Sequence, residues 1–600
     1  MAYESFYESP LYSLEPGYTS LSKGYGDIFI GARAPFSSFS MATDARTANQ
    51  LQEVSNKLNP GGKAIEVSMV SPEIFDAIPK QHLKEINRLS KLTGAEMSFH
   101  AGTIIEPSGI TKQGYSDESR EAAEREGWQA VARAHELSPK GNMPVVFHTT
   151  ASLPGTEYGF EEIDGKRVEV EKKIPVINQE TSELRLAKKE ERFYPGMDKP
   201  KISMPIDEID VMNRSSWENR LTQVVFNVEK GNDILRASYP QVAGEITDFI
   251  NNKITPEQLQ KEIDSDPEKR AAYNQVQTAQ VFLENTDLEL NALFNQVYKY
   301  GTPEQKKELM RLNDEYKEVK IKKRDYLEQV GKRFAAQQDL INGLRPLAPQ
   351  VYVPVEDFAA TKVAKTFGDI AFNAYKKFGK DAPMITLENP PAGTGLSRAK
   401  DVENVIKKSR EIFVEQAVKK GISRNTAESE SKKLITATWD LGHVNMLRRY
   451  GFEDKDIIKE TETIAPLVKH VHLSDNFGYE HTELPMGMGN VPTKDILEKL
   501  EKAGFSGKKV IEAASWYQHF KTMPLVPTLE AFGSPMYAMR MQQPYWNQMA
   551  NTPGEYFSGY GPVLPDQHFS MYGTGFSGMP VELGGQMPGK TSRMSGTPME

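Results

Sequence analysis

Cysteine is absent from this chain of 600 residues. Disulfide bridges and thiolate metal sites are therefore excluded, and any metal ion has to be held by histidine, aspartate and glutamate side chains. Ligands of these kinds suit hard or borderline divalent cations such as Mn²⁺, Co²⁺, Mg²⁺ and Zn²⁺.

Long apolar segments are also absent. No apolar run approaches the roughly 20 residues that a membrane-spanning helix needs, and the amino terminus lacks the basic-then-apolar pattern of a signal peptide. The formal net charge of −9 weighs against a surface that coats nucleic acid. We therefore expect an acidic cytoplasmic protein without a membrane partner.

Short apolar runs of strand type alternate with amphipathic helical segments over two stretches of the chain. Helical segments are predicted at 43–58, with Thr43 as the N-cap, and at 117–137, 357–378, 399–420, 454–468 and 493–503. The predicted strands are 27–33, 63–70, 95–100, 143–148, 384–388, 435–440, 470–474 and 508–513. Eight short strands separated by helices predict a closed parallel (β/α)8 TIM barrel of the α/β class.

Polar residues stand at the carboxyl ends of six predicted strands, the edge at which such barrels carry their chemistry. Five of the ten histidines lie at or just after these ends. A single histidine or glutamate there is usually a hydrogen-bonded rim residue, but six converging on one barrel mouth would be costly without a cation. The strand-end residues are His100, His148, Glu388, Asp440, His472 and Glu512, and His443 and His481 lie on loops just beyond. His470 is expected deeper in the barrel, as a satisfied interior residue.

At these residues the sequence resembles a known family. The ordered motifs SFHAG, VVFHTT, LENPPAGTG, TWDLGH, HVHLSDN, HTELPMGMGN and VIEAAS are similar to those of the xylose isomerase-like barrel superfamily, over about residues 27–152 and 356–520. That superfamily includes sugar phosphate isomerases and epimerases, and endonuclease IV.

The resemblance implies two ligand sets. The epimerase branch holds one divalent ion through four ligands that match Glu388, Asp440, His472 and Glu512, with Glu388, Glu512 and His443 as catalytic residues. Endonuclease IV holds three zinc ions through nine ligands, of which eight match, the additional ones being His100, His148, His443 and His481. At the ninth position, where that branch has aspartate two residues before the last histidine, this chain has Tyr479, followed by Glu480.

Two functions follow from the resemblance. The first is a divalent-metal-dependent sugar or sugar-phosphate isomerase or epimerase, in which Glu388 and Glu512 transfer a proton through an enediolate. The motifs HLSDN and DLGH, the acidic charge and the missing aspartate favour it. The alternative is an endonuclease IV-like zinc phosphodiesterase acting on abasic DNA, favoured by His100, His148 and ENPPAGTG; only this function requires a nucleic-acid partner. A barrel kept solely as a scaffold does not account for the intact ligands.

The remaining segments complete the predicted organisation. Residues 1–26 form an irregular amino-terminal arm, 27–154 the first half of the barrel and 356–524 the second half. Residues 155–355 form a long, mainly helical insertion between strands four and five that begins with a charged hairpin. The insertion follows His148 and is expected on the catalytic face as a lid or a homo-oligomer contact. Residues 525–600 are a Gly/Pro/Met-rich tail, expected to be disordered.

Overall fold

The computed structural model describes residues 30, 34, 36–59, 62–69, 74, 77–102, 106–319, 330–513, 516, 520 and 523–532. The chain divides into two compact units, residues 1–175 with 355–600 and residues 176–354. The predicted arm at 1–26 and the tail from 533 onwards lie outside the described residues. The first residues assigned to the tail do not fit a disordered segment, since Leu525–Ala531 form helix α19 and Phe532 packs on Phe39 with ring centroids 5.0 Å apart.

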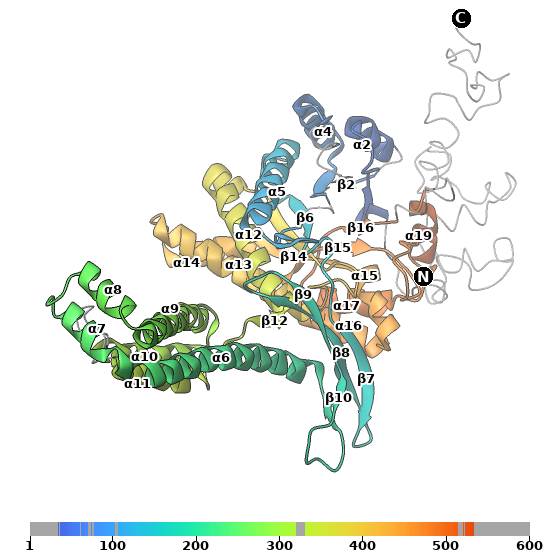
Figure 1. The fold of residues 1–600 in the computed structure, drawn as a ribbon. Coiled ribbons are helices and arrows are strands. Elements are labelled where there is room, and N and C mark those ends of the chain that lie inside the picture. Colours follow the sequence, from blue (N-terminus) through green and yellow to red (C-terminus); the bar gives the residue numbers. More distant parts are fainter. Residues whose placement is uncertain are drawn as a thin grey trace, which may run out of the picture. The chain divides into compact units, whose positions relative to one another are not determined.

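The first unit contains a closed barrel of eight strands, each parallel to both neighbours, which confirms the predicted α/β barrel (Figure 1). Strands β1 and β16 complete the ring by pairing Phe39 with Lys509. In order around the barrel the strands are β1 (Phe39–Ala42), β16 (Lys509–Ile511), β15 (Val468–Leu473), β14 (Ile435–Asp440), β13 (Met384–Glu388), β6 (Pro144–His148), β3 (Glu96–His100) and β2 (Ala64–Ser68).

The first strand and first helix lie later in the chain than predicted. The barrel closes through β1, which follows the 3-10 turn η2 (Phe36–Ser38). The strand predicted at 27–33 lies, except for residue 30, outside the described part of the chain. Helix α2 (Gln50–Leu58) is capped by Asn49, whose side chain accepts from the backbone N–H of Gln52. Thr43 is not the cap, because its hydroxyl donates to the Gln50 side chain at 2.6 Å.

Helices of the first unit lie outside the ring of strands (Figure 1). Their inner faces are apolar: in α4, for example, Leu83 and Ile86 are fully buried, and Gly94 ends that helix in the left-handed conformation, which costs glycine little. The helices are α4 (Lys80–Thr93), α5 (Asp117–Leu137), α12 (Val355–Phe378), α13 (Ala399–Lys419), α14 (Arg424–Leu434), α15 (Leu441–Asn445), α16 (Asp454–Ile464) and α17 (Thr493–Lys502), with short 3-10 turns η4 (Gly379–Asp381), η5 (Met446–Tyr450) and η6 (Ala465–Leu467).

Two hairpins extend the first unit. The small one pairs β4 (Ile110–Thr111) with β5 (Gly114–Tyr115). The larger one pairs β7 (Glu157–Ile163) with the first part of β8 (Lys166–Asn178), which matches the charged hairpin expected from the sequence. Its turn residues Asp164 and Gly165 both have positive φ, as a tight hairpin turn requires. Phe160 packs on Phe452 with ring centroids 5.0 Å apart, so this hairpin is attached to the loops of the barrel.

The second unit, residues 176–354, has a hydrophobic core of its own. Buried residues from its helices form this core, and one of them, Trp217, donates its ring N–H to the carbonyl of Leu344 at 3.1 Å. The long helices α6 and α9 pack side by side (Figure 1). The elements are β9 (Leu184–Lys188), β10 (Glu190–Arg192), β11 (Lys201–Ser203), α6 (Pro205–Ser238), η3 (Tyr239–Gln241), α7 (Ala243–Ile250), α8 (Pro256–Asp264), α9 (Pro267–Tyr300), α10 (Pro303–Val319), α11 (Val330–Leu344) and β12 (Tyr352–Pro354), which pairs with the end of β8.

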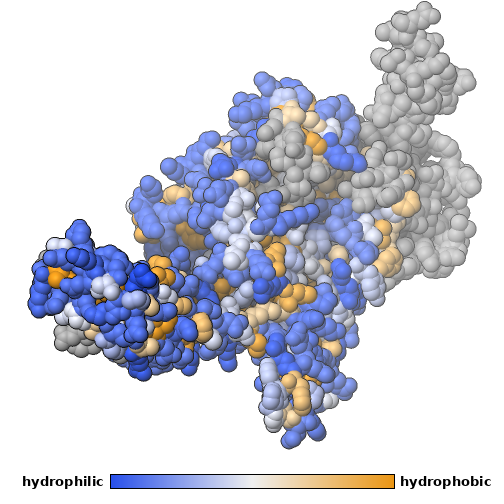
Figure 2. Space-filling view, viewed as in Figure 1, coloured by the Kyte–Doolittle hydropathy of each residue, from blue (hydrophilic) through white to orange (hydrophobic). Residues whose placement is uncertain are grey.

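The described helices are also informative about membranes. None of them combines the length and the apolar character that a bilayer crossing demands. On the face drawn in Figure 2, hydrophobic residues are scattered in small groups among hydrophilic ones.

Candidate metal centre

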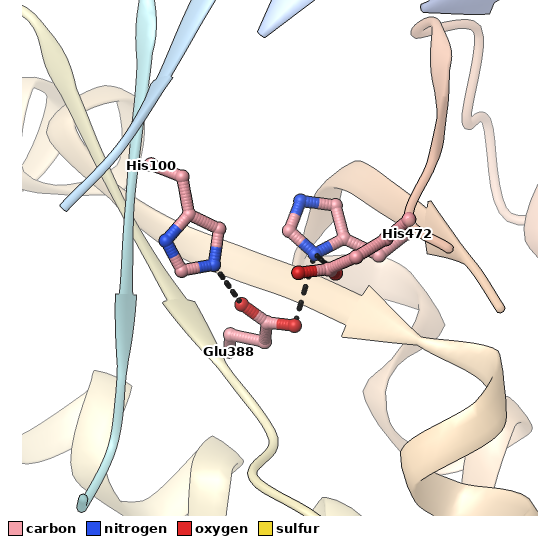
Figure 3. Close-up of side chains that lie close together, drawn as sticks. His100, Glu388 and His472 are labelled. Atoms are coloured by element: carbon pink, nitrogen blue, oxygen red, sulfur yellow. Dashed lines mark hydrogen bonds and ion pairs between the residues drawn. The ribbon is translucent and has the colours of Figure 1, made fainter. Parts of the chain in front are cut away.

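Four strand-end side chains meet at the carboxyl edge of the barrel. Glu388 lies between two imidazoles (Figure 3): its Oε1 is 2.9 Å from Nδ1 of His472, and its Oε2 is 3.2 Å from Nε2 of His100. Oε2 of Glu512 lies 2.7 Å from the same Nδ1 of His472. One ligand atom from each of the four residues lies within 4.8 Å of the other three, a spacing that a metal ion could bridge.

The strand register accounts for this convergence. Parallel pairing places Glu388 of β13 opposite His148 of β6, and Asp440 of β14 opposite His472 of β15. Side chains that end neighbouring parallel strands share one edge of the barrel. His148 therefore also reaches Glu388, with its Nε2 3.4 Å from Oε2. Two histidines face one oxygen of this carboxylate, and His472 faces the other.

Asp440 belongs to a second, overlapping cluster. It caps the short helix α15 by accepting the backbone N–H of His443 at 2.6 Å, and the hydroxyl of Ser474 donates to it at 3.2 Å. Nδ1 of His443 lies 3.7 Å from both the Asp440 and the Glu388 carboxylates. Of the four ligands inferred from the resemblance, the structure thus places three together with His100, and places Asp440 with Glu388 and His443.

His443 and His481 meet at the outer side of the centre. Nδ1 of His443 donates to the carbonyl of Asn389 at 2.8 Å, which leaves its Nε2 facing Nε2 of His481 at 2.8 Å. On the other side of this pair, Oε1 of Glu483 lies 3.5 Å from Nε2 of His481. Both Tyr479 and Glu480, at and beside the position where the endonuclease branch has aspartate, are exposed.

The ionisable groups of the centre shift one another's pKa values. Burial would lower the pKa of His472, but Glu388, Glu512 and Glu66 around it hold that pKa well above its ordinary value. Burial would raise the pKa of Glu512, but His472 lowers it to about 2. For Asp440, burial together with the charges of Glu512 and Glu388 raises the pKa well above the usual range. The carboxylates therefore repel one another, and the imidazolium of His472 supplies the compensating charge.

These residues fit a divalent cation. Oε2 of Glu512 is buried and accepts no hydrogen bond within the described part of the chain, although His472 Nδ1 is close by. This oxygen has no hydrogen bond to give up, and imidazole nitrogens and further carboxylates lie beside it. Together these groups form a ligand set for Mn²⁺, Co²⁺, Mg²⁺ or Zn²⁺. A cation would replace the protons that now offset the carboxylate charges.

One residue of the centre was missed by the sequence reasoning. Glu66, in the middle of β2, is buried and lies 2.8 Å from Nε2 of His470 and 3.1 Å from Nε2 of His472. The available signal was a glutamate inside the apolar run AIEVS. His470 is confirmed as a satisfied interior residue.

Comparisons with known proteins add little. No family model matches the chain. An 80-residue stretch is 32% identical to an uncharacterized protein of Methanocaldococcus jannaschii; it covers 13% of this chain and only about a quarter, 26%, of that relative. Among solved structures, one titled as a D-tagatose 3-epimerase-like protein aligns over 84% of this chain and 98% of its own, at 12% identity and a TM-score of 0.36. Similarity at that level carries no argument by itself, so the barrel is established by the strand pairing described above.

Proposed function

We propose that the barrel is a divalent-metal-dependent isomerase or epimerase of sugars or sugar phosphates. The observation that carries the proposal is the convergence of two carboxylates on one point, since Glu388 and Glu512 lie 2.9 and 2.7 Å from the same nitrogen of His472. Two carboxylates that flank one position suit the removal of a carbon-bound proton and its return at a neighbouring carbon or on the other face.

The two carboxylates are not equivalent. Both oxygens of Glu388 are engaged by histidines and its side chain is fully buried. The side chain of Glu512 is 23% exposed, and its Oε2 accepts no hydrogen bond among the described residues. We therefore assign the first proton abstraction to Glu512, which becomes protonated as the enediolate forms and later releases that proton to solvent. Glu388 then delivers a second proton to the enediolate, taken from the imidazolium of His100 beside its Oε2, and is ionised again.

Other residues would orient the substrate. Because Nδ1 of His443 donates to the Asn389 carbonyl, its Nε2 is a hydrogen-bond acceptor, and a sugar hydroxyl could take the place of the present contact with Nε2 of His481. When bound by Glu388, Asp440, His472 and Glu512, a divalent ion would polarise adjacent substrate oxygens.

Solvent-exchange experiments test this function. Incubation with each divalent ion in ²H₂O, with a panel of ketoses and their phosphates, should place deuterium at the carbon next to the carbonyl of at least one sugar. Glu512→Gln should abolish this exchange, whereas the exposed control Glu480→Gln should retain it. A protein that binds the ion stoichiometrically yet exchanges no sugar in the panel would contradict the proposal.

A second function is favoured by one specific observation. Glu388 presents Oε2 to His100 and His148, at 3.2 and 3.4 Å, and Oε1 to His472. A carboxylate that divides its oxygens between two histidine groups is suited to bridge two cations, as in metal-dependent phosphodiesterases. Two or three zinc ions per chain, a lower count in His100→Ala and His148→Ala, and cleavage of abasic duplex DNA would establish this function in place of the first.

A further inference from the structure

Glu66 is held rigidly beneath the metal centre. Its carboxylate comes from the interior of β2 and is 1% exposed. The hydroxyl of Ser98 donates to its Oε2 at 2.8 Å, and Nε2 of His470 lies 2.8 Å from the same oxygen. With Oε2 fixed twice, Oε1 is left facing Nε2 of His472 at 3.1 Å, an ion-pair contact whose alignment falls short of a hydrogen bond.

His472 is thereby contacted at both ring nitrogens. Its Nδ1 faces Glu388 and Glu512, and its Nε2 faces Glu66. The ring of His100 stacks on it at 5.4 Å, so the imidazole has little freedom to flip. A histidine that offers Nδ1 to a cation must carry its remaining hydrogen on Nε2, and a carboxylate at that nitrogen favours this tautomer.

We propose that Glu66 is a positioning residue that fixes the His472 ring and its Nε2–H tautomer, so that Nδ1 is directed at the Glu388–Glu512 pair. This inference rests on the metal centre of the proposed function and adds a residue that acts only through His472. A purely structural Glu66 would serve instead as the partner of His470. The two roles differ in which histidine matters for ion binding.

Metal titration separates the two roles. We would measure Zn²⁺ and Co²⁺ affinity by calorimetry and the number of ions per chain by elemental analysis, for the wild type, Glu66→Gln and the control His470→Gln. The control removes the other imidazole from Glu66 but keeps the Glu66–His472 contact. Loss of an outer carboxylate partner typically weakens metal binding roughly 10–100-fold. We expect a weakening in that range for Glu66→Gln at an unchanged number of ions at saturation, and less than a roughly threefold effect for His470→Gln.

Nitrogen NMR gives a readout that does not depend on activity. In zinc-loaded wild type labelled with ¹⁵N-histidine, His472, assigned by comparison with His472→Gln, should show the Nε2–H tautomer with Nδ1 on the metal. If Glu66→Gln does not fold, Ser98→Ala, which releases one of the two contacts on Oε2, should weaken binding in the same direction by a smaller factor.

Three results would overturn the inference. Equal ion affinity of the wild type and folded Glu66→Gln would remove the positioning role while leaving the proposed function intact. Loss of one whole ion per chain in Glu66→Gln would make Glu66 a ligand, together with His470 and His472. A zinc-loaded wild type whose His472 carries hydrogen on Nδ1 would also refute it. A wild type that binds no divalent ion would refute both the inference and the proposed function.

Discussion

Replacing Asp401 by asparagine should stabilise the protein above neutral pH. Asp401 lies in the first turn of α13, where its carboxylate accepts the backbone N–H of Arg398 at 3.3 Å. The guanidinium of Arg398 is already paired with Glu169 and Glu460, at 2.7 and 2.6 Å. Burial, with the charge of Glu356 adding to it, therefore raises the pKa of Asp401 to about 7.

The magnitude follows from linkage. A pKa displaced from 3.8 to about 7 corresponds to an upper bound of about 4 kcal/mol, at about 1.4 kcal/mol for each pKa unit. Glu356 and Asp401 repel each other, so protonation of either group lowers the cost of charging the other. We therefore expect Asp401→Asn to gain only about 2 kcal/mol in the free energy of unfolding. The folded state retains its proton while the unfolded state loses it between pH 4 and 7, so wild-type stability falls over this window as pH rises. The side-chain oxygen of asparagine can still accept a hydrogen bond from the backbone N–H of residue 398. Because an amide does not ionise, the variant should not lose stability in this way as the pH rises.

Urea unfolding followed by circular dichroism, at pH 5 and at pH 8, measures the effect. Asp401→Asn should gain stability relative to the wild type mainly at the higher pH. Asp495→Asn is the matched control, since Asp495 is also in the first turn of a helix, α17, but is exposed. Parallel pH profiles of wild type and Asp401→Asn, or a variant less stable than the wild type at pH 8, would refute the reasoning.

Three further predictions concern the centre and the second unit. A divalent ion at about 100 times its Kd should raise the free energy of unfolding of the wild type by about 2.7 kcal/mol. Thermal unfolding with and without the ion measures this gain, and Glu512→Gln should lose most of it. An equal gain in the variant would argue against Glu512 as a ligand. Trp217→Ala should destabilise the second unit by about 3–5 kcal/mol, because Trp217 is buried in that unit's own core. The ion affinity of the barrel, measured by calorimetry, should stay unchanged. A parallel loss of ion binding would contradict the view that the two units have separate cores. Replacing residues 177–353 by a short linker should leave a folded barrel, since Val176 and Pro354 are paired neighbours on β8 and β12. It should alter either the number of chains per particle in solution or the substrate affinity, and unchanged values of both would exclude a lid or an oligomer contact.

Much of the barrel could be predicted from the sequence alone. Seven of the eight barrel strands overlap the predicted ranges, and His100, Glu388 and Asp440 stand at the last residue of their strands as expected. These features depend on local signals, namely apolar runs of strand length, helical periodicity and the rule that barrel chemistry lies at carboxyl ends. Local signals are present in any single sequence.

Other features were decided only by the tertiary structure. The short strand β1, which was not predicted, is selected by its pairing with β2 and β16, the latter about 470 residues away in the chain. The contact of Glu66 with His470 spans 404 residues. Whether His100 or Asp440 lies nearest the Glu388–Glu512 pair depends on side-chain direction at the barrel mouth, where Asp440 turns to cap α15. Such choices depend on contacts between residues that are distant in the chain, and local periodicity does not encode these contacts.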